Sequence, residues 1–294
     1  MRDSRARSSI HCWGKAIKID NKVAFITGAG SGIGRALAQC FVAAGARAVV
    51  CSDLNVADAQ ATAAALGEKA SALELDVANA PALTAAVAET EQQFGALDVM
   101  VSNAGYGRAG GLDLATEEWE RMMQVHTWSH LNAARAAIPG MVERGSGYFL
   151  HTASAAGLLT QMDSGPYAVS KHAAVAFAEW LLINYADRGI GVSVLCPQAV
   201  RTNILANASD RAPAVEKTEK DAAKSRQAAG DGILEPKVVA DDCLQAMQEE
   251  RFLVLPHPEV DTYFKRKAND YDRWLAGMQR FRRKLRGGSK GGSS

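Results

Sequence analysis

Short apolar runs alternate with longer helix-forming stretches over most of this 294-residue chain. Each apolar run has the length of a strand, and the first lies directly before a glycine-rich turn. Strands that alternate with helices of about ten or more residues are typical of βαβ units, whose right-handed crossovers build a parallel sheet covered on both faces. We therefore predict an α/β fold: a doubly wound parallel sheet of Rossmann type, with about seven strands and helices on both faces.

The expected elements follow from this alternation. The strands are 23–27, 48–51, 71–75, 97–101, 148–152, 190–196 and 252–255, and the main helices are 32–44, 57–66, 80–94, 116–143 and 165–188. A bend in the long helix is expected near Pro139, since proline removes a backbone hydrogen bond. Ligands bind at the carboxyl ends of such strands, so the residues after each strand are the first candidates for a site.

The chain divides into a core and several appendages. We expect a flexible tail over 1–20, one Rossmann-type domain over 21–256, a helical extension over 257–286 and a Gly/Ser linker-like tail over 287–294. The polar, alanine-rich segment 206–232 fits equally well a pair of surface helices or a lid over a pocket. The extension carries an aromatic stripe that we expect to pack on the core or on a neighbouring subunit: Tyr263, Phe264, Tyr271, Trp274 and Phe281.

Composition excludes several classes of protein. The formal net charge is +1, which does not suggest a nucleic-acid-binding surface. No uninterrupted apolar run approaches the roughly 20 residues that a membrane span requires. The five cysteines are scattered and lack metal-type spacing, so we predict no metal site and a reducing, cytoplasmic location.

The first strand ends in the sequence TGAGSGIG, and a helix follows directly. Glycines permit a tight turn and a close approach of the backbone, and a helix start offers free N–H groups to a pyrophosphate. A structural turn is the alternative, but the position between strand and helix favours a dinucleotide. The predicted cofactor-binding residues here are Gly28, Ser31, Gly32, Ile33 and Gly34.

Asp53 closes the second predicted strand and Leu54 follows it. A carboxylate at this point can accept hydrogen bonds from the adenosine ribose hydroxyls and would repel a 2′-phosphate. Neither Leu54 nor Ser31 supplies a cation that could bind such a phosphate. This pattern predicts NAD rather than NADP as cofactor, unless Asp53 is merely an exposed turn residue.

Tyr167 and Lys171 occupy positions i and i+4 at the start of a predicted helix, so they share one helix face. A free tyrosine has a pKa of about 10 and is a poor base at neutral pH. A nearby lysine cation and the positive nicotinamide ring of NAD⁺ would favour the phenolate. The pair alone is a common chance pattern, but Ser154, at the end of the fifth strand, can hydrogen-bond a substrate oxygen and orient it toward Tyr167.

With these motifs the sequence resembles the short-chain dehydrogenase/reductase family, over about residues 22–255. The motifs recur in order: the glycine turn, Asp76-Val77, Asn103-Ala104-Gly105, Ser154, Tyr167 with Lys171, and Pro197 through Val200 to Thr202. The resemblance implies that Asp76 and Val77 flank the adenine and that Lys171 also holds the nicotinamide ribose. It further implies that the remaining residues line the cofactor cleft: Asn103, Ala104, Gly105, Tyr167, Pro197, Val200 and Thr202.

Two positions depart from the family pattern. His126 stands where the family usually has a catalytic asparagine, whose role there is to steady a helix bend and a water leading to the lysine. A histidine could take part in that proton relay or simply pack. Gln198 replaces the glycine that usually follows the proline, and it could project into the substrate pocket.

The implied activity is hydride transfer between nicotinamide and a secondary alcohol, with Ser154, Tyr167, Lys171 and His126 as the catalytic set. We expect Ser154, Leu158, Tyr167 and Gln198 to contact the substrate, beside apolar Ala155, Leu159 and Met162. This mostly apolar wall favours a hydrophobic or aromatic alcohol, whose ketone is the substrate in reverse. The alternatives are a ketoacyl-thioester reductase and a catalytically silent NAD-binding scaffold.

Family members commonly pair through two neighbouring helices. The alanine-rich stretches 133–138 and 173–182 fit such a face, so the resemblance implies a homodimer or homotetramer with closed symmetry.

Overall fold

The computed structural model describes residues 15–202 and 231–287. It contains one seven-stranded parallel sheet in the order β3-β2-β1-β4-β5-β6-β7. The strands are β1 (Val23–Thr27), β2 (Ala48–Asp53), β3 (Ala70–Glu74), β4 (Val99–Ser102), β5 (Gly147–Thr152), β6 (Ile190–Leu195) and β7 (Leu253–Val254). The strand order reverses beside β1, where β4 pairs with it, and this switch is where doubly wound sheets bind ligands. The predicted fold class is confirmed.

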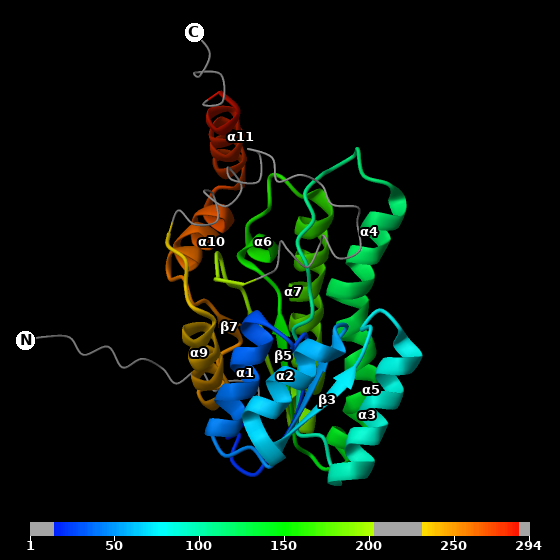
Figure 1. Cartoon of the computed structure of the whole chain (residues 1–294). Coiled ribbons are helices and arrows are strands. Elements are labelled where there is room, and N and C mark those ends of the chain that lie inside the picture. The colour runs from blue at the N-terminus through cyan, green and yellow to red at the C-terminus, as the bar shows by residue number, and fades with distance from the viewer. Residues whose placement is uncertain (1–14, 203–230, 288–294) are drawn as a thin grey trace, which may run out of the picture.

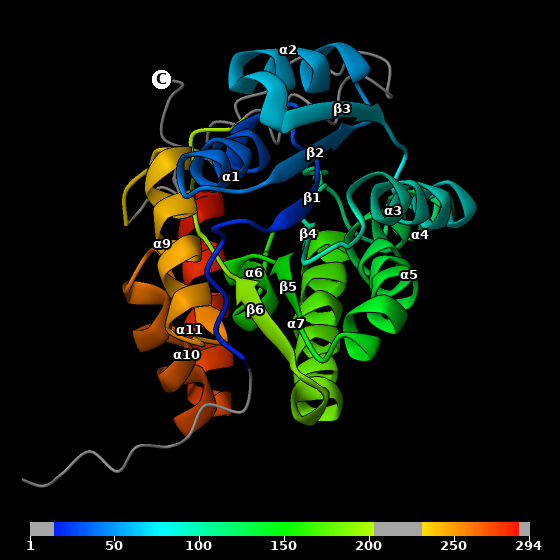
Figure 2. The ribbon, with the colours of Figure 1, turned by 90° about the horizontal axis from the view of Figure 1, so that it is seen from below.

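The helices cover the sheet on both faces, as Figure 2 shows. On one face, α1 (Gly32–Ala43) and α9 (Pro236–Gln248) pack over a core around Leu37, Phe41 and Cys243. On the other, α3 (Ala80–Phe94), α5 (Ser129–Glu143) and α7 (Gly165–Tyr185) enclose a second core. Every residue of β1, β4, β5 and β6 is buried, which explains why these strands read as continuous apolar runs.

The remaining helices lie at the margins of the sheet. They are α2 (Val56–Leu66), α4 (Thr116–Met123), the one-turn α6 (Ala155–Leu158), α10 (Glu259–Asn269) and α11 (Tyr271–Gly287). In Figure 1, α10 and α11 stand beyond α9, on the side of α6. Within the described residues, no helix combines the length and the apolarity needed to cross a membrane. The predicted lid over 206–232 falls almost entirely outside the described residues.

The break in the predicted helix 116–143 is not at Pro139, which lies inside α5. Instead, residues Gln124–Trp128 form a π-helical turn between α4 and α5. Side chains satisfy nearby carbonyls: the Ser129 hydroxyl donates to the Val125 carbonyl at 2.6 Å, and Thr127 donates to the Ser170 carbonyl at 3.0 Å. Such π-turns occur frequently at functional sites.

The expected flexible tail over 1–20 is wrong for its last part. Ile17 and Ile19 are buried in the core beneath α1 and α9. The Ile17 amide also donates to the Met247 carbonyl at the end of α9, at 3.1 Å. Apolar side chains and a backbone partner therefore hold this segment on the sheet.

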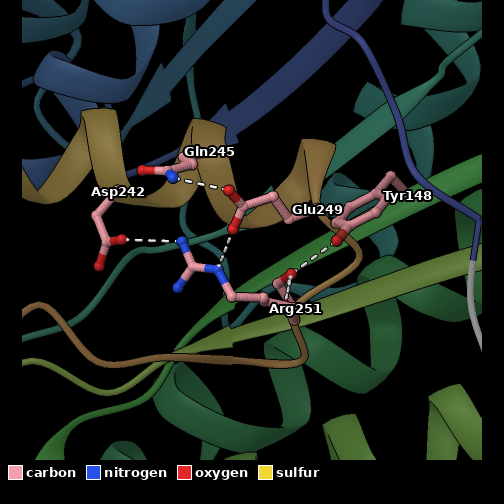
Figure 3. Close-up of polar contacts among 6 residues, drawn as sticks. Tyr148, Asp242, Gln245, Glu249 and Arg251 are labelled. Atoms are coloured by element: carbon pink, nitrogen blue, oxygen red, sulfur yellow. Dashed lines mark hydrogen bonds and ion pairs between the residues drawn. The ribbon is translucent and has the colours of Figure 1, made fainter. Parts of the chain in front are cut away.

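A polar network closes the amino ends of β5 and β7, and Figure 3 shows its residues. Arg251 lies in the turn between α9 and β7, and its guanidinium contacts Asp242 at 3.1 Å and Glu249 at 2.7 Å. The Tyr148 hydroxyl lies 2.7 Å from Ser193, which donates to the Arg251 carbonyl at the same distance. These bonds fix the edge of the sheet at the end opposite the carboxyl ends of its strands.

Candidate active site

A cleft of about 1640 Å³ lies across the carboxyl ends of the strands. The structure brings most of the predicted cofactor residues together in its wall: Gly28, Ser31, Gly32, Ile33, Asp53, Leu54, Asp76, Val77, Asn103, Ala104, Gly105, Tyr167, Lys171, Pro197, Val200 and Thr202. Segments far apart in the sequence thus meet at one surface.

At two positions of the glycine turn, Gly28 and Gly34, neighbouring backbone leaves no space for a side chain. Gly28 has φ of 66°, and a Cβ there would stand 2.9 Å from the Ala104 Cα. A Cβ on Gly34 would stand 2.1 Å from the Gly28 carbonyl oxygen. Gly34 does not line the cleft, so its role is close packing of helix on strand rather than the predicted cofactor contact. In the described structure no side chain caps α1, so its first N–H groups are free to bind an anion such as a pyrophosphate.

Thr27 joins the ends of β1 and β4, a role that the sequence reasoning missed. Its hydroxyl accepts the Asn103 and Ala104 amides at 2.9 and 3.0 Å. The Asn103 side chain donates to the Thr27 carbonyl at 3.0 Å and accepts from the Thr152 hydroxyl at 3.1 Å. Asn103 therefore acts mainly as a brace between β1, β4 and β5.

Asp53 ends β2 beside the glycine turn. Its carboxylate accepts the Gly30 amide at 2.9 Å and the Asn55 amide at 3.0 Å. Arg35 points elsewhere, because its guanidinium donates to the Thr62 hydroxyl and to the Gly30 carbonyl. A carboxylate beside a glycine cradle suits an adenosine ribose, so these residues fit a dinucleotide.

Asp76, assigned to the adenine pocket, is bridged by Arg121 of α4. The guanidinium nitrogen lies 2.9 and 3.0 Å from the two carboxylate oxygens. Both residues line the cleft. Arg121 was not predicted, because only the fold brings α4 over the carboxyl end of β3.

Ser154, Tyr167 and Lys171 are brought together in the middle of the cleft. Ser154 caps α6, where its hydroxyl accepts the Ala156 amide at 3.1 Å, and its side chain also hydrogen-bonds Tyr167. The Lys171 ammonium donates to the Thr152 carbonyl at 2.9 Å and lies 5.7 Å from the centre of the Tyr167 ring. A hydroxyl, a phenol and a buried amine thus share one site.

Burial has the largest effect on the pKa values of Tyr167 and Lys171. It raises the pKa of Tyr167, and the hydrogen bond from Ser154 acts in the opposite direction. It lowers the pKa of Lys171 to about 8, since a buried ammonium has lost its hydration. We predicted that Lys171 would lower the pKa of Tyr167, but in the protein without a bound cofactor burial raises that pKa instead.

His126 lies in the π-turn, fully buried, and does not line the cleft. Its Nε2 accepts the Tyr106 amide at 3.1 Å, so the ring proton is on Nδ1, which lies 3.0 Å from the Ser170 hydroxyl. Burial, followed by the charge of Lys171, holds the pKa of His126 well below its ordinary value. Of the two roles that the sequence left open, proton relay or packing, these contacts fit packing: His126 braces the 103–106 turn against α7.

The substrate side of the cleft corrects two expectations. Leu158 is buried in the core instead of lining the cleft, and Met162 does not line it either, whereas Ala155 and Leu159 do. Gln198 reaches the cleft as predicted, but its side-chain amide donates to Asp231 at 2.8 Å. Asp231 in turn accepts the Tyr263 hydroxyl at 3.0 Å, which ties this wall to α10.

The C-terminal helices complete the cleft, and the sequence reasoning missed this. The residues that they contribute to its wall are Tyr263, Arg266, Trp274, Met278 and Phe281. Three of these belong to the aromatic stripe that was expected to pack on the core or a subunit, and only Phe264 of the stripe packs against the main core. The spacing of Trp274, Met278 and Phe281 on one helical face was the available signal.

Comparison with known proteins gives a consistent result. Residues 22–213 match the family model described as short chain dehydrogenase. The chain is 35% identical over 201 residues to a 2,5-dichloro-2,5-cyclohexadiene-1,4-diol dehydrogenase of Sphingobium indicum, covering 67% of this chain and 80% of the relative. It is 32% identical over 259 residues to a 1-deoxy-11-beta-hydroxypentalenate dehydrogenase of Streptomyces exfoliatus, covering 86% and 89%.

A solved structure agrees with these relatives. The crystal structure of a short-chain dehydrogenase/reductase from Burkholderia phymatum in complex with NAD superposes with a TM-score of 0.79 and is 30% identical in sequence. The match covers 87% of this chain and 96% of that one. Given the sheet order, the glycine cradle and the Ser154–Tyr167–Lys171 group, the chain belongs to the short-chain dehydrogenase/reductase family of oxidoreductases.

Proposed function

We propose that this enzyme interconverts a hydrophobic or aromatic secondary alcohol and its ketone, with NAD as cofactor. The observation that carries the proposal is the position of Tyr167 between Ser154 and Lys171, in a cleft that α10 and α11 close with aromatic side chains. The relatives named above, whose names describe dehydrogenation of cyclic substrates, support an apolar ring in the same place.

The proposed roles follow from the contacts. Ser154 holds the substrate oxygen beside the phenol, and Tyr167 takes the alcohol proton during oxidation or returns it during reduction. Lys171, held by the Thr152 carbonyl, favours the phenolate through its charge. When bound, the dinucleotide supplies the hydride acceptor, C4 of its nicotinamide ring.

We propose NAD over NADP because of Asp53 and Leu54. The carboxylate of Asp53 faces the position of the adenosine ribose and would repel a 2′-phosphate, and Leu54 adds no positive charge. The Burkholderia phymatum structure holds NAD in a related fold, which supports the same choice.

A homodimer or homotetramer is part of the proposal, with the contact on the outer face of α7, which includes part of the expected stretch 173–182. The alanines of 133–138 and 173–182 mostly face the core. The exposed large apolar side chains on α7 are Val169, Trp180 and Ile183, with 50%, 52% and 78% of their surface accessible. An outward apolar face of this kind suits a symmetric contact between copies.

The decisive test is a panel of secondary alcohols, from cyclohexanol to aryl-alkyl carbinols and steroids, with NADH fluorescence as the readout. We expect turnover with NAD⁺ to rise with apolar bulk and to exceed turnover with NADP⁺. Activity confined to thioester-linked hydroxyacyl substrates would contradict the proposal and favour a ketoacyl-thioester reductase. Binding of NADH without turnover of any member would instead favour a silent scaffold.

A further inference from the structure

Lys267 of α10 is a cation placed inside the protein, with only 8% of its surface exposed. Its ammonium donates to the Leu158 carbonyl at 2.7 Å and to the Leu159 carbonyl at 2.9 Å. It also lies 3.4 Å from Nε2 of His172. Among the residues that the structure describes, no carboxylate forms an ion pair with it. A lysine that is buried without a counter-charge requires a specific reason.

Two aromatic rings complete the surroundings of this ammonium. It lies 5.0 Å from the centre of the Trp274 ring and 5.6 Å from that of Tyr271. These distances are within cation–π range, and three acceptors match the three N–H donors of an ammonium. Burial lowers the pKa of Lys267, yet every contact of the group favours the charged form. The site is therefore built for a cation and is occupied by one from the chain itself.

Lys267 contacts the two carbonyls at the end of α6, and this short helix begins at the proposed catalytic residue Ser154. A helix of four residues is too short to be stable by itself, and its last carbonyls lack partners within the helix. Lys267 supplies those partners and places a positive charge at the negative end of the helix dipole. The geometry of Ser154 therefore depends on a residue more than a hundred positions later in the chain.

The C-terminal helices α10 and α11 also hold the loop that follows α6. Arg282 of α11 donates to the Met162 carbonyl at 2.7 Å and contacts the Asp163 carboxylate at 3.2 Å. His172, which directly follows Lys171 on α7, bonds the Ala168 carbonyl through Nδ1 at 2.8 Å and leaves Nε2 to accept from Lys267. Both chain segments that carry catalytic groups are thus tied to the C-terminal extension.

We propose that Lys267 is a positioning residue, which holds α6 so that the Ser154 hydroxyl stays beside Tyr167. Through this contact, the C-terminal helices α10 and α11 help to set the geometry of the active site. The catalytic consequence rests on the alcohol dehydrogenase function proposed above. The positional consequence, order in residues 155–159, does not depend on that function.

The test compares Lys267→Met, Lys267→Gln and Lys267→Arg with the control Lys265→Met. Lys265 lies on the same helix, is exposed and contacts only Asp261, at 2.5 Å. Three quantities are measured: kcat and KM for the best alcohol of the panel, NADH affinity, and deuterium uptake at 155–159. These amides are informative because they bond within the turn or to Pro197, including Gly157 to Ser154 and Leu159 to Ala155, both at 2.8 Å.

For Lys267→Met we expect a loss of about tenfold to a hundredfold in kcat, because small misplacements of a catalytic group have effects of this size. NADH affinity should change less than about twofold, since the glycine cradle is untouched, and uptake at 155–159 should rise. Lys267→Arg should recover much of the rate because a guanidinium can donate to both carbonyls. Lys265→Met should behave as wild type.

Wild-type kcat and unchanged uptake at 155–159 in Lys267→Met would overturn the proposal. Increased uptake throughout the sheet, β1 included, would also contradict it, since it would make Lys267 a general stabilising residue. If Lys267→Met does not fold, Lys267→Gln, which keeps a donor, must show the same local rise in uptake. If wild type turns over no alcohol, the proposed function fails, and the uptake comparison still decides the role of Lys267.

Discussion

The cofactor wall and the substrate wall of the cleft differ in how the chain builds them. The cofactor wall comes from Gly28 to Asp53 and from strand ends beside them, joined by short hydrogen bonds such as that from the Gly30 amide to the Asp53 carboxylate at 2.9 Å. The substrate wall joins α6 and its loop to α10 and α11, through the long side chains of Lys267 and Arg282.

This difference affects how each wall can change. In the cofactor wall a side chain is excluded by backbone, as at Gly28, where a Cβ would stand 2.9 Å from the Ala104 Cα, so substitutions there disturb the fold itself. In the substrate wall the lining is made of side chains on two helices outside the sheet, which can change without altering a strand. We therefore expect cofactor preference and alcohol preference to be separable by mutation.

The largest effect is expected where the two walls meet. Tyr167→Phe removes only the phenol oxygen, so turnover should fall by about a thousandfold or more while NADH still binds. The matched control is Tyr185→Phe, on the same helix but away from the cleft. Stopped-flow hydride transfer and NADH titration measure the two quantities, and a variant that keeps most of its activity would contradict the assigned acid/base.

A smaller effect should be confined to the cofactor wall. Asp53→Ser combined with Leu54→Arg removes the carboxylate and adds a cation, and together the two changes should be worth about 1.5–3 kcal/mol, as for hydrogen bonds to charged groups. The ratio of kcat/KM for NAD⁺ over NADP⁺ should fall by about tenfold to a hundredfold, with the KM for the alcohol unchanged. A change in the KM for the alcohol as large as the change in the cofactor ratio would show that the two walls are coupled.

The pH dependence of stability tests Lys171, at the junction of the walls. The pKa of Lys171 is about 8 in the folded protein and takes its ordinary value of 10.5 in the unfolded chain. Between these pH values the unfolded chain therefore binds more protons than the folded protein does. Raising the pH across this window should therefore stabilise the fold, by about 2 kcal/mol from pH 8 to 9.5. Burial raises the pKa of cysteines such as Cys51, which acts in the opposite direction in both proteins, so the gain is measured by urea unfolding as the difference between wild type and Lys171→Met. Parallel curves of stability against pH would exclude the assigned shift.

The smallest effect is expected in the substrate wall. Phe281→Ala removes an aromatic ring from α11, so KM for a bulky alcohol should rise by about tenfold while KM for cyclohexanol changes little. Leu275→Ala is the control, because this residue lies on the same helix outside the cleft lining. A rise in NADH dissociation constant with Phe281→Ala would break the division between the walls.

The sequence by itself determined the features that depend on local pattern. Continuous apolar runs predicted the strands because both faces of a parallel sheet are covered, and TGAGSGIG predicted the cradle because only glycine permits that turn. Ser154, Tyr167 and Lys171 were also found from sequence. The end of β5 and one face of α7 bring them together in the cleft.

Only the tertiary structure decided the features that depend on side-chain direction and distant contacts. The helix breaks at the π-turn around His126 rather than at Pro139, where the Ser129 hydroxyl satisfies the Val125 carbonyl and Thr127 ties the turn to the Ser170 carbonyl of α7. Leu158 turns into the core while its carbonyl binds Lys267. Spacing along the chain carries no record of such a contact, because the two residues become neighbours only when α10 packs against α6.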